Sequence, residues 1–257
     1  KNKKIKIGSQ NCYHKNIFSS DTGAISPYMI KKIGCLGKLI YWIFSSPDNS
    51  SPDWYLLNTL GMSGGWGFEK QKHSHLEIKI SRIDKPLFQT LWFTDIRRFA
   101  TLTLTHNPVE RFQKIGPDWL ASIPPSLTQF RQKFLQDRKK DKTLPVLLMD
   151  QSLFSGCGNY LKAEVLYRSK LSPFRTPASL SPEEWNSLYT EMLQTIRESY
   201  HANGTTIATY KTTDGHRGNY YERLKVYNQK IDPLGYQVVK IQTADKRTTH
   251  WVPEVQK

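Results

Sequence analysis

A stretch near the middle of the chain combines the residue types that bind a phosphate group. It covers residues 149–164 and reads MDQSLFSGCGNYLKAE. Its two glycines, Gly156 and Gly158, let the backbone turn sharply and approach a ligand without a Cβ in the way. A helix from about Asn159 to Arg168 would then present free N–H groups to an anion, with the Asn159 amide as a further donor. The alternative is a plain helix-turn-helix corner in which Asn159 is only an N-cap.

The charge balance points to a polyanionic partner. The 257 residues include 37 Lys+Arg against 22 Asp+Glu, which gives a formal net charge of +15. The cations are spread along the chain and are not packed into one tail, and no lipid-seeking amphipathic helix accompanies them. Nucleic acid is therefore favoured over a membrane surface. The alternative is a basic protein that its charge merely keeps soluble.

Cysteine and histidine spacing argues against a metal site. Cys12, Cys35 and Cys157 are widely separated and form no CxxC pair, which excludes a four-cysteine zinc site and a disulfide framework. His73 and His75 lie two residues apart, where they would share one face of a strand, but no further ligand follows at zinc spacing. A metal at these two histidines stays open as an alternative.

No segment predicts a membrane span or a secretion signal. The longest apolar run, Leu39–Phe44, suits a buried strand and is far too short to cross a bilayer. The first residues, Lys1–Ile7, are basic and have no apolar region behind them. These features predict an intracellular protein, in the nucleus if the source is eukaryotic and otherwise in the cytoplasm.

The chain up to about residue 107 has the pattern of short antiparallel strands. Its apolar segments are rich in β-branched and aromatic residues and are separated by Gly, Pro, Asn or Asp. Segments of this length and spacing favour a sandwich or a barrel, and Asn107–Pro108 then interrupts the pattern. The predicted strands are Lys38–Phe44, Trp54–Leu60, His75–Ile80, Leu87–Phe93 and Phe99–Leu104.

The next part of the chain has helical periodicity. Residues 181–184 (SPEE) form a capping box with proline at the first helical position, which predicts a helix start, and Asn203–Gly204 predicts its end. A shorter apolar stripe supports the helix over residues 159–168. We expect both stripes to face the core, with a partner-binding face as the alternative. The long stripe is Trp185, Leu188, Tyr189, Met192, Leu193, Ile196 and Tyr200, and the short one is Leu161, Val165 and Leu166.

The last part of the chain returns to a strand pattern. We expect strands at Leu224–Tyr227, Tyr236–Ile241 and Thr248–Val252, with a turn at Asp232–Gly235. The predicted fold class is therefore α+β. It has an N-terminal antiparallel β-sandwich over residues 1–107, a helical domain over residues 108–222 and a small hairpin module over residues 223–257.

Five segments, taken in order, have counterparts in one known family. Residues 149–174 (MDQSLFSGCGNYLKAEVLYRSKLSPF) are similar to a helix-two-turn-helix, a DNA-binding element. Four shorter segments are similar to a lysine-bearing strand, a methionine loop, an arginine–phenylalanine loop and a bend into the helical domain: Gly37-Lys38, Leu60–Gly64, Phe93–Phe99 and Ile115–Asp118. Together they resemble the Fpg/Nei family of DNA glycosylases, most of all its eukaryotic and viral Nei-like branch, over nearly the whole chain.

The resemblance implies a hairpin of the zincless kind at the C-terminus. Zinc-bearing members have four finger cysteines, whose places fall near Asp232–Tyr236 and Trp251–Val255, and neither segment contains a cysteine. Residues Lys246–Trp251 nevertheless resemble the strand that carries the finger arginine, which would be Arg247. We therefore expect a zincless finger hairpin behind the helix-two-turn-helix domain, and no zinc or other cofactor.

The start of the chain departs from the family pattern. Family members begin with Pro-Glu, in which the proline amine is the nucleophile and the glutamate is the acid, and residues 1–11 contain neither residue. These residues resemble the strand that follows the family's first helix. The expectation is that this sequence starts a short way inside the true N-terminus. The alternative is a natural homologue that has lost catalysis and kept DNA binding.

The resemblance also implies roles for individual residues. Met62, Arg97 and Phe99 would fill the space left by an everted nucleotide, since wedge residues at kinked steps are typically apolar and arginine reads base edges well. From residue type alone, Met62 and Phe99 would be core residues. Arg98, Asn159, Tyr160 and Arg247 would bind DNA phosphates, Lys38 would assist catalysis electrostatically, and Lys211, His216 and Arg217 would contact the lesion.

These roles imply a base-excision-repair DNA glycosylase and AP lyase that excises oxidised bases and cleaves the strand by β-elimination through a Schiff base. Its partner would be damaged DNA, duplex or single-stranded, and the protein would act as a monomer. One alternative is a non-catalytic damaged-DNA-binding protein of the same fold. Another is an RNA-binding helix-two-turn-helix protein of the ribosomal kind, which would explain the helical unit but not the N-terminal sandwich.

Overall fold

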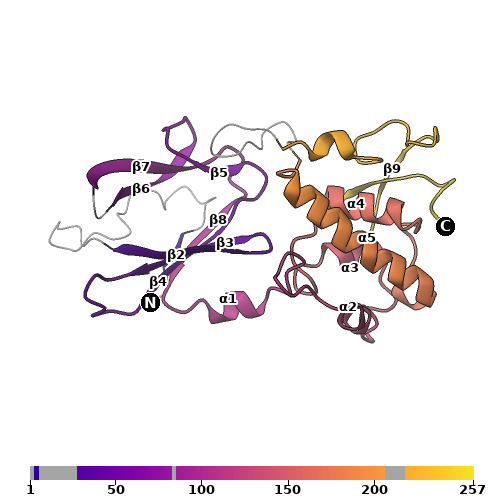
Figure 1. The fold of residues 1–257 in the computed structure, drawn as a ribbon, viewed down its shortest axis with the longest axis horizontal. Coiled ribbons are helices and arrows are strands. Elements are labelled where there is room, and N and C mark those ends of the chain that lie inside the picture. The colour runs from indigo at the N-terminus through magenta and orange to yellow at the C-terminus, as the bar shows by residue number, and fades with distance from the viewer. Residues whose placement is uncertain (1–2, 6–27, 83–84, 206–217) are drawn as a thin grey trace. The chain divides into compact units, whose positions relative to one another are not determined.

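The computed structural model describes residues 3–5, 28–82, 85–205 and 218–257 (Figure 1). Within these residues the chain divides into two compact units. The first extends to Phe112, and the second begins at Gln113. The first unit is built from strands and the second mainly from helices.

Two antiparallel sheets make up the first unit (Figure 1). The larger sheet has the strand order β1-β8-β4-β3-β2, and the smaller sheet has the order β5-β7-β6. The larger sheet contains β1 (Lys3–Ile5), β2 (Met29–Leu36), β3 (Leu39–Ser45), β4 (Trp54–Thr59) and β8 (Thr101–Thr105), and the smaller contains β5 (Gly64–Gly67), β6 (Ser74–Arg82) and β7 (Lys85–Asp95).

A single apolar cluster joins the two sheets. Trp42 and Leu102 enter it from the larger sheet, and Leu91 and Phe93 enter it from the smaller one. Trp66 of β5 bridges the two contributions, because its ring centroid lies 5.2 Å from that of Trp42 and 5.0 Å from that of Phe93. Inward-facing residues of two sheets packed in this way define a sandwich, so the prediction of an N-terminal antiparallel β-sandwich is confirmed.

Two strands of the sandwich were not predicted from the sequence, and one was placed differently. β2 is exposed along most of its length and lacks the apolar alternation of a half-buried strand, while β5 has the sequence GGWG. Both form because neighbouring strands supply backbone partners: β2 pairs with β3, and β5 pairs with β7. The predicted strand from Phe99 begins only at Thr101, and Phe99 lies in a loop.

Five α-helices and two 3₁₀ turns lie in the described chain after β8. The start of α5 confirms the predicted capping box, because Ser181 Oγ accepts from Glu184 N at 3.2 Å and Glu184 Oε2 accepts from Ser181 N at 2.8 Å. Three short helices were not predicted, because they have five to eight residues and too few turns to show a period. The elements are α1 (Val109–Gln113), α2 (Leu127–Phe134), α3 (Leu144–Met149), α4 (Asn159–Arg168), η1 (Pro177–Ser179), α5 (Pro182–His201) and η2 (Tyr220–Arg223).

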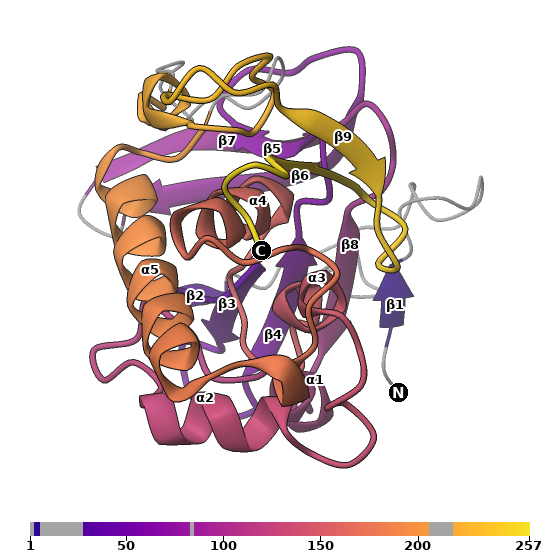
Figure 2. The ribbon, with the colours of Figure 1, turned by 90° about the vertical axis from the view of Figure 1, so that its right-hand side faces the viewer.

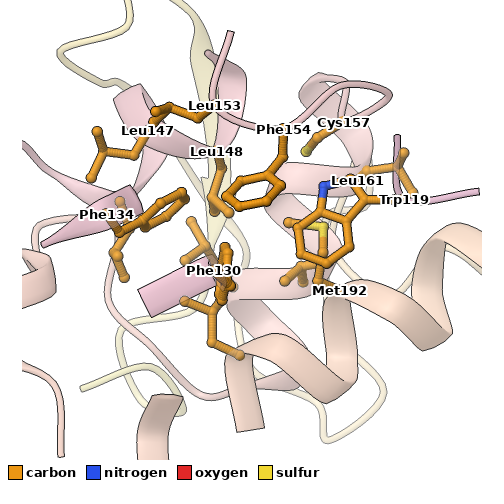
Figure 3. Packing of buried hydrophobic residues seen from close by; sticks show 14 of the residues in the cluster. Trp119, Phe130, Phe134, Leu147, Leu148, Leu153, Phe154, Cys157, Leu161 and Met192 are labelled. Atoms are coloured by element: carbon orange, nitrogen blue, oxygen red, sulfur yellow. The ribbon is translucent and has the colours of Figure 1, made fainter. Parts of the chain in front are cut away.

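The apolar stripe of α5 faces the helical core, as expected. Trp185 packs there against Phe130, with ring centroids 5.6 Å apart. Met192 lies in the same cluster as Trp119 and Phe130 (Figure 3). Tyr200, which the spacing placed in the same stripe, is 65% exposed. It lies in the last turn of the helix, beyond the buried cluster, so the prediction of a core position is wrong for this residue.

Helix α4 is enclosed on all sides. It lies between α5 and the C-terminal hairpin (Figure 2), and every residue from Leu161 to Tyr167 is buried. The predicted stripe accounts for only part of this burial. A helix without a solvent face must also bury polar side chains, and α4 buries Lys162 and Glu164 completely.

The carboxylate of Glu164 organises the chain that follows η2. Oε1 accepts from the backbone N–H groups of Val226 and Tyr227 at 2.9 and 2.8 Å, and Oε2 accepts from that of Lys225 at 2.9 Å. The prediction of a strand over Leu224–Tyr227 is therefore wrong. The amides of this segment bind a side chain instead of a neighbouring strand, and the apolar residues that suggested a strand pack against α4.

The C-terminal hairpin consists of β9 (Val239–Gln242) and β10 (Thr248–Trp251), paired in antiparallel register. The predicted turn at Asp232 is present, because Gly235 N donates to Asp232 O at 3.1 Å. Asp232 is buried, and its Oδ2 accepts from the Tyr167 hydroxyl of α4 at 2.9 Å. A small apolar cluster ties the hairpin module to α4: Ala163, Tyr167, Val226, Val238 and Val252, with Tyr227 and Val255 at its edge.

Replacing Glu164 by Ala should destabilise the second unit. The substitution removes the acceptor of three backbone donors, and each buried donor left unsatisfied costs about 1–3 kcal/mol. We expect the free energy of unfolding, measured by urea titration with far-UV circular dichroism, to fall by about 3 kcal/mol or more. The matched control is Glu254→Ala, which removes an exposed glutamate. Equal effects of the two substitutions would contradict this role of Glu164.

Candidate nucleic-acid interface

Two loops of the first unit are joined through one buried carboxylate. The first loop, residues 60–63, precedes β5, and the second, residues 96–100, follows β7, whose last residue is Asp95. Asp95 is fully buried; its Oδ1 accepts from Ser63 Oγ at 2.5 Å, and its Oδ2 accepts from Ala100 N at 2.8 Å. Ser63 Oγ also accepts from Arg97 N at 3.0 Å. The two loops therefore form one hydrogen-bonded unit, called the paired loops below.

Close backbone packing adds to these hydrogen bonds. Gly61 has a φ of +62°, and a Cβ at this position would lie 2.8–2.9 Å from backbone atoms of Phe99 and Ala100. Only glycine combines that φ with so little space. The glycine of the Leu60–Gly64 motif is thus required by the second loop, which lies more than thirty residues further along the chain.

The paired loops present three side chains together at the surface. Met62 is 50% exposed and Phe99 is 58% exposed, so the core position that residue type favoured is wrong for both. The Arg97 guanidinium lies over the Phe99 ring at 4.8 Å, and its Nη1 lies 3.4 Å from Met62 Sδ. The structure therefore brings together all three residues predicted to fill a DNA void. Arg98, next in the chain, is exposed and has a φ of +56°.

A second group of predicted residues lies at the start of α4. Gly158 is the N-cap of this helix and Asn159 is its first residue, so the alternative that Asn159 is only an N-cap is wrong. Asn159 Nδ2 donates to Thr248 O of β10 at 2.9 Å, while Asn159 Oδ1 is buried and has no partner among the described residues. The first N–H groups of a helix have no intrahelical acceptor, and they attract anions.

The turn between β9 and β10 carries Arg247 beside this helix start. Arg247 is exposed, and the carbonyl of the next residue, Thr248, is the acceptor of Asn159. The structure therefore brings Arg247 and Asn159 together although 88 residues separate them in the chain. An arginine beside a helix N-terminus combines a forked cation with free N–H donors, and both bind phosphate oxygens.

Tyr160 takes a different place from the one predicted. Its hydroxyl lies 2.8 Å from Ser199 Oγ of α5, and burial raises the pKa of this hydroxyl. The side chain therefore joins α4 to α5, and its polar atom already has a partner inside the unit. A phosphate role for this residue then falls to its backbone N–H in the first turn of α4.

The predicted site residues also include Lys38 and three lesion-contacting candidates. Lys38 is exposed in the turn between β2 and β3, one residue before the strand that was expected to contain it. Lys211, His216 and Arg217, the lesion-contacting candidates, lie outside the described residues. The paired loops belong to the first unit and the Asn159–Arg247 group to the second.

The structure gives one of the two candidate metal ligands a structural partner. His75 Nε2 lies 2.9 Å from the backbone oxygen of Asp95. Across residues 3–5, 28–82, 85–205 and 218–257, no three His, Cys, Asp or Glu side chains are grouped as metal ligands. His250 of β10 is buried, and burial together with nearby Lys240 and Lys162 lowers its pKa. Among the same residues, no helix is both long and apolar enough to cross a membrane.

Four residues that build these groups were not predicted. They are Asp95 and Ser63 of the paired loops, and Lys162 and Asp245, whose side chains lie 2.7 Å apart beside the Asn159–Arg247 group. The available signal was indirect: Lys162 is a charged residue next to the apolar Leu161, while Asp95 and Ser63 lie inside the Phe93–Phe99 and Leu60–Gly64 motifs without a role of their own there. Neither signal could show that the partners of these side chains lie 32 and 83 residues away.

Comparison with known proteins identifies the family. Residues 120–211 match the family model described as the formamidopyrimidine-DNA glycosylase H2TH domain, and residues 221–257 match the formamidopyrimidine-DNA glycosylase C-terminal domain. A curated relative from Exiguobacterium sp., named formamidopyrimidine-DNA glycosylase, is 32% identical over 213 residues, which are 79% of this chain and 74% of the relative. The chain belongs to the formamidopyrimidine-DNA glycosylase family.

Further members support the assignment. A formamidopyrimidine-DNA glycosylase from Desulfitobacterium hafniense is 31% identical over 221 residues, or 76% of each chain. Among solved structures, MutM (Fpg) from Thermus thermophilus aligns with a TM-score of 0.75 at 26% identity, covering 93% of this chain and 87% of that one. Lactococcus lactis Fpg in complex with DNA containing an abasic site aligns with a TM-score of 0.74 at 27% identity, covering 91% and 84%.

Membership of the formamidopyrimidine-DNA glycosylase family confirms the resemblance and the α+β fold expected from it. It also excludes the ribosomal RNA-binding alternative, because the matched relatives and structures span both units of this chain. Assignment to the zincless Nei-like branch stays a prediction.

Replacing Asp95 by Ala should loosen the paired loops. The hydrogen bonds from Ser63 and Ala100 to the charged carboxylate are lost, and we expect the first unit to lose about 2–4 kcal/mol of stability. Hydrogen exchange of the β5 and β8 amides measures this loss within one unit. Asp48→Ala, which removes an exposed carboxylate from the same unit, is the control. Unchanged exchange in Asp95→Ala would show that the loops hold together without the carboxylate.

Proposed function

We propose that this chain is a base-excision-repair DNA glycosylase and AP lyase that everts and excises oxidised bases and then cleaves the strand by β-elimination. The observation that carries the proposal is the group of Met62, Arg97 and Phe99. All three side chains are exposed, Arg97 contacts both Met62 and Phe99, and a buried carboxylate joins the loops that carry them. Exposed apolar residues on a firmly held loop are typical of a binding surface and are not expected in an ordinary solvent-exposed loop.

Base eversion gives each of the three residues a task. An enzyme that acts at the sugar of a stacked nucleotide must extrude it, at a cost of a few kcal/mol. Met62 then acts as the apolar wedge in the vacated stack, and Phe99 stacks on a neighbouring base. Arg97, held against the Phe99 ring, presents its fork to the edge of the unpaired opposite base.

Phosphate contacts hold the strand that carries the lesion. We assign these contacts to Asn159 and Arg247 in the second unit and to Arg98 and Lys38 in the first, with the N–H groups at the start of α4 as further donors. A formal net charge of +15 supports this assignment, because phosphate contacts supply most of the non-specific affinity for DNA.

The names of the relatives support the same activity. Curated relatives are named formamidopyrimidine-DNA glycosylase, and the structural relatives include Lactococcus lactis Fpg with DNA containing an abasic site and MutM with DNA containing carbocyclic 8-oxo-G. By analogy with this family, we propose that the protein acts as a monomer on damaged DNA, in the nucleus of a eukaryotic cell or in the cytoplasm of a bacterium.

The chemical step requires an amine. The amine attacks the anomeric carbon of the sugar, the base leaves with its bonding electrons, and a Schiff base forms. The Schiff base acidifies the neighbouring sugar proton, so that β-elimination breaks the strand on the 3′ side of the lesion. In the family the amine is that of an N-terminal proline followed by glutamate, and residues 1–11 contain neither residue. We therefore compare the product of the whole gene with residues 1–257 in the test that follows.

Borohydride trapping tests the activity directly. The full gene product should form a covalent adduct with a duplex containing one abasic site, because borohydride reduces the Schiff base to a stable amine. Residues 1–257 alone should bind that duplex without forming the adduct. Salt-sensitive binding without an adduct in either protein would overturn the enzyme proposal and leave a damaged-DNA-binding module.

Substitutions in the paired loops test the structural basis. Met62→Ala and Arg97→Ala should slow excision of an oxidised base from duplex DNA while leaving adduct formation at a preformed abasic site less affected, since that substrate has no base to extrude. Ile123→Ala, which removes an exposed apolar side chain from the second unit, is the control. Equal loss on both substrates would argue against a role in base eversion.

We further propose that the C-terminal hairpin needs no metal. Three contacts of the hairpin module support this: the apolar cluster around Val252, the Asp232–Tyr167 hydrogen bond, and the amides bound by Glu164. Burial, followed by the hydrogen bond to Asp232, raises the pKa of Tyr167 to about 12, so this hydroxyl stays a donor at neutral pH. These contacts hold the module to α4 through side chains and amides of the chain itself.

Chelation tests the prediction of a metal-free hairpin. Prolonged dialysis against EDTA should leave both the melting temperature and the affinity for an abasic-site duplex unchanged, because no bound ion holds the hairpin. In a zinc-bearing formamidopyrimidine-DNA glycosylase treated in parallel, both the melting temperature and the affinity for the duplex should fall. A fall in DNA affinity that added zinc restores would overturn the proposal.

A further inference from the structure

A buried ion pair joins α4 to the turn of the C-terminal hairpin. Lys162 Nζ lies 2.7 Å from Asp245 Oδ2, and the two side chains are 0% and 6% exposed. Lys162 lies three residues after Asn159, so both side chains leave α4 on the same face. Burial lowers the pKa of Lys162, although the hydrogen bond to Asp245 and the charge of Asp245 act in the opposite direction. Burial would raise the pKa of Asp245, but the hydrogen bonds from Lys162 and Thr243 outweigh it, so that this pKa is lowered.

Asp245 passes this constraint to the backbone of the turn. Its Oδ1 accepts from Thr243 Oγ1 at 2.5 Å and from Arg247 N at 3.4 Å. Thr243 Oγ1 also lies 2.7 Å from Thr249 Oγ1, which crosses the hairpin. Lys246 adopts a φ of +60°, an uncommon conformation for a residue other than glycine. The side chain of Asp245 thus bonds the turn from which Arg247 projects, in addition to the backbone hydrogen bonds from Thr243 N to Arg247 O at 3.1 Å and from Lys246 N to Thr243 O at 2.8 Å.

Two tethers hold this turn to the start of α4, and Arg247 lies between them in the chain. The first is the Lys162–Asp245 pair on one side, and the second is the Asn159–Thr248 hydrogen bond on the other. The second tether uses Asn159 Nδ2 and leaves Oδ1 buried without a partner among the described residues. Both phosphate-binding candidates of the second unit are therefore oriented by the same pair of contacts.

We propose that Lys162 and Asp245 are positioning residues that hold Arg247 and Asn159 on the same DNA phosphate. The proposal rests on the proposed function, because it assigns a cause to the geometry of those phosphate contacts. A buried ion pair is a poor source of stability, since desolvation offsets most of its attraction. The pair is better explained by the orientation that it gives to Arg247. Lys162 has no solvent contact, and its partner Asp245 is hydrogen-bonded to the turn that carries Arg247.

The salt dependence of DNA binding separates positioning from general stabilisation. Each phosphate contact contributes about 0.9 to the slope of log affinity against log salt concentration on duplex DNA. Lys162→Met and Asp245→Asn should each weaken binding to an abasic-site duplex and lower this slope by about 0.9, and Arg247→Ala should have the same effect. A variant that only unfolds a fraction of the protein would lower the active concentration and leave the slope unchanged.

Combined variants test whether the pair acts as one unit. Lys162→Met together with Asp245→Asn should bind no more weakly than either single variant, because either change already frees the turn. Lys162→Met should likewise change the salt slope of Arg247→Ala no further, because Asn159, the other residue that the pair positions, is neutral. Additive affinity losses in the Lys162→Met/Asp245→Asn double variant, or an unchanged slope in both single variants, would overturn the proposal. Lys162→Arg keeps the charge, so its salt slope should lie closer to that of the wild type than the slope of Lys162→Met.

Arg175→Met is the matched control for breaking an ion pair in the same unit. Arg175 holds Glu184 at 2.7 Å at the start of α5, away from the hairpin turn. Its loss should leave the salt slope unchanged. All variants should also be measured on an undamaged duplex of the same length. A wild type that binds both duplexes equally would count against the proposed glycosylase, while the slope comparison would still test the positioning role. If Lys162→Met does not fold, Asp245→Asn tests the loss of the ion pair, and Lys162→Arg serves as the variant that retains it.

Discussion

The enclosure of α4 is the constraint on which the second unit depends. A helix with no solvent face cannot place its polar side chains in water, so each must find a partner within the protein. Glu164 meets this requirement with three backbone amides after η2, and Lys162 meets it with Asp245 in the hairpin turn. The same requirement therefore builds the C-terminal module around the helix and places the hairpin beside the helix start.

The first unit uses the same kind of contact for a different purpose. Asp95 is the buried last residue of β7, where it pairs with Gly64 of β5, and the hydrogen bonds that its carboxylate accepts from Ser63 and Ala100 join the two loops beyond these strands. The exposed Met62, Arg97 and Phe99 depend on this support, because isolated apolar and cationic side chains on mobile loops would lose entropy on binding. A rigid base lets the three residues enter a DNA stack without first being ordered.

Residue patterns predicted the elements that have enough turns or strands to show a period. The capping box at Ser181 was predicted to the residue, and the helix predicted from about Asn159 to Arg168 is present over that range. Patterns failed where pairing with a neighbour decides the structure: β5 is glycine-rich and forms only on β7, and Leu224–Tyr227 looks apolar enough for a strand but binds Glu164. The functional residues were found through family motifs, while Asp95, Lys162 and Asp245 were missed because each acts on a distant segment.

By itself, the sequence determined that this protein is basic, that strands precede helices, and that the residues of a formamidopyrimidine-DNA glycosylase occur in order. Those properties depend on composition and on the spacing of residues close together in the chain, and both can be read directly from the sequence. Only the tertiary structure decided that Met62 and Phe99 are exposed side by side and that Arg247 lies next to Asn159. The reason is physical: a buried carboxylate takes whichever donors the fold brings to it, and spacing along the chain does not reveal them.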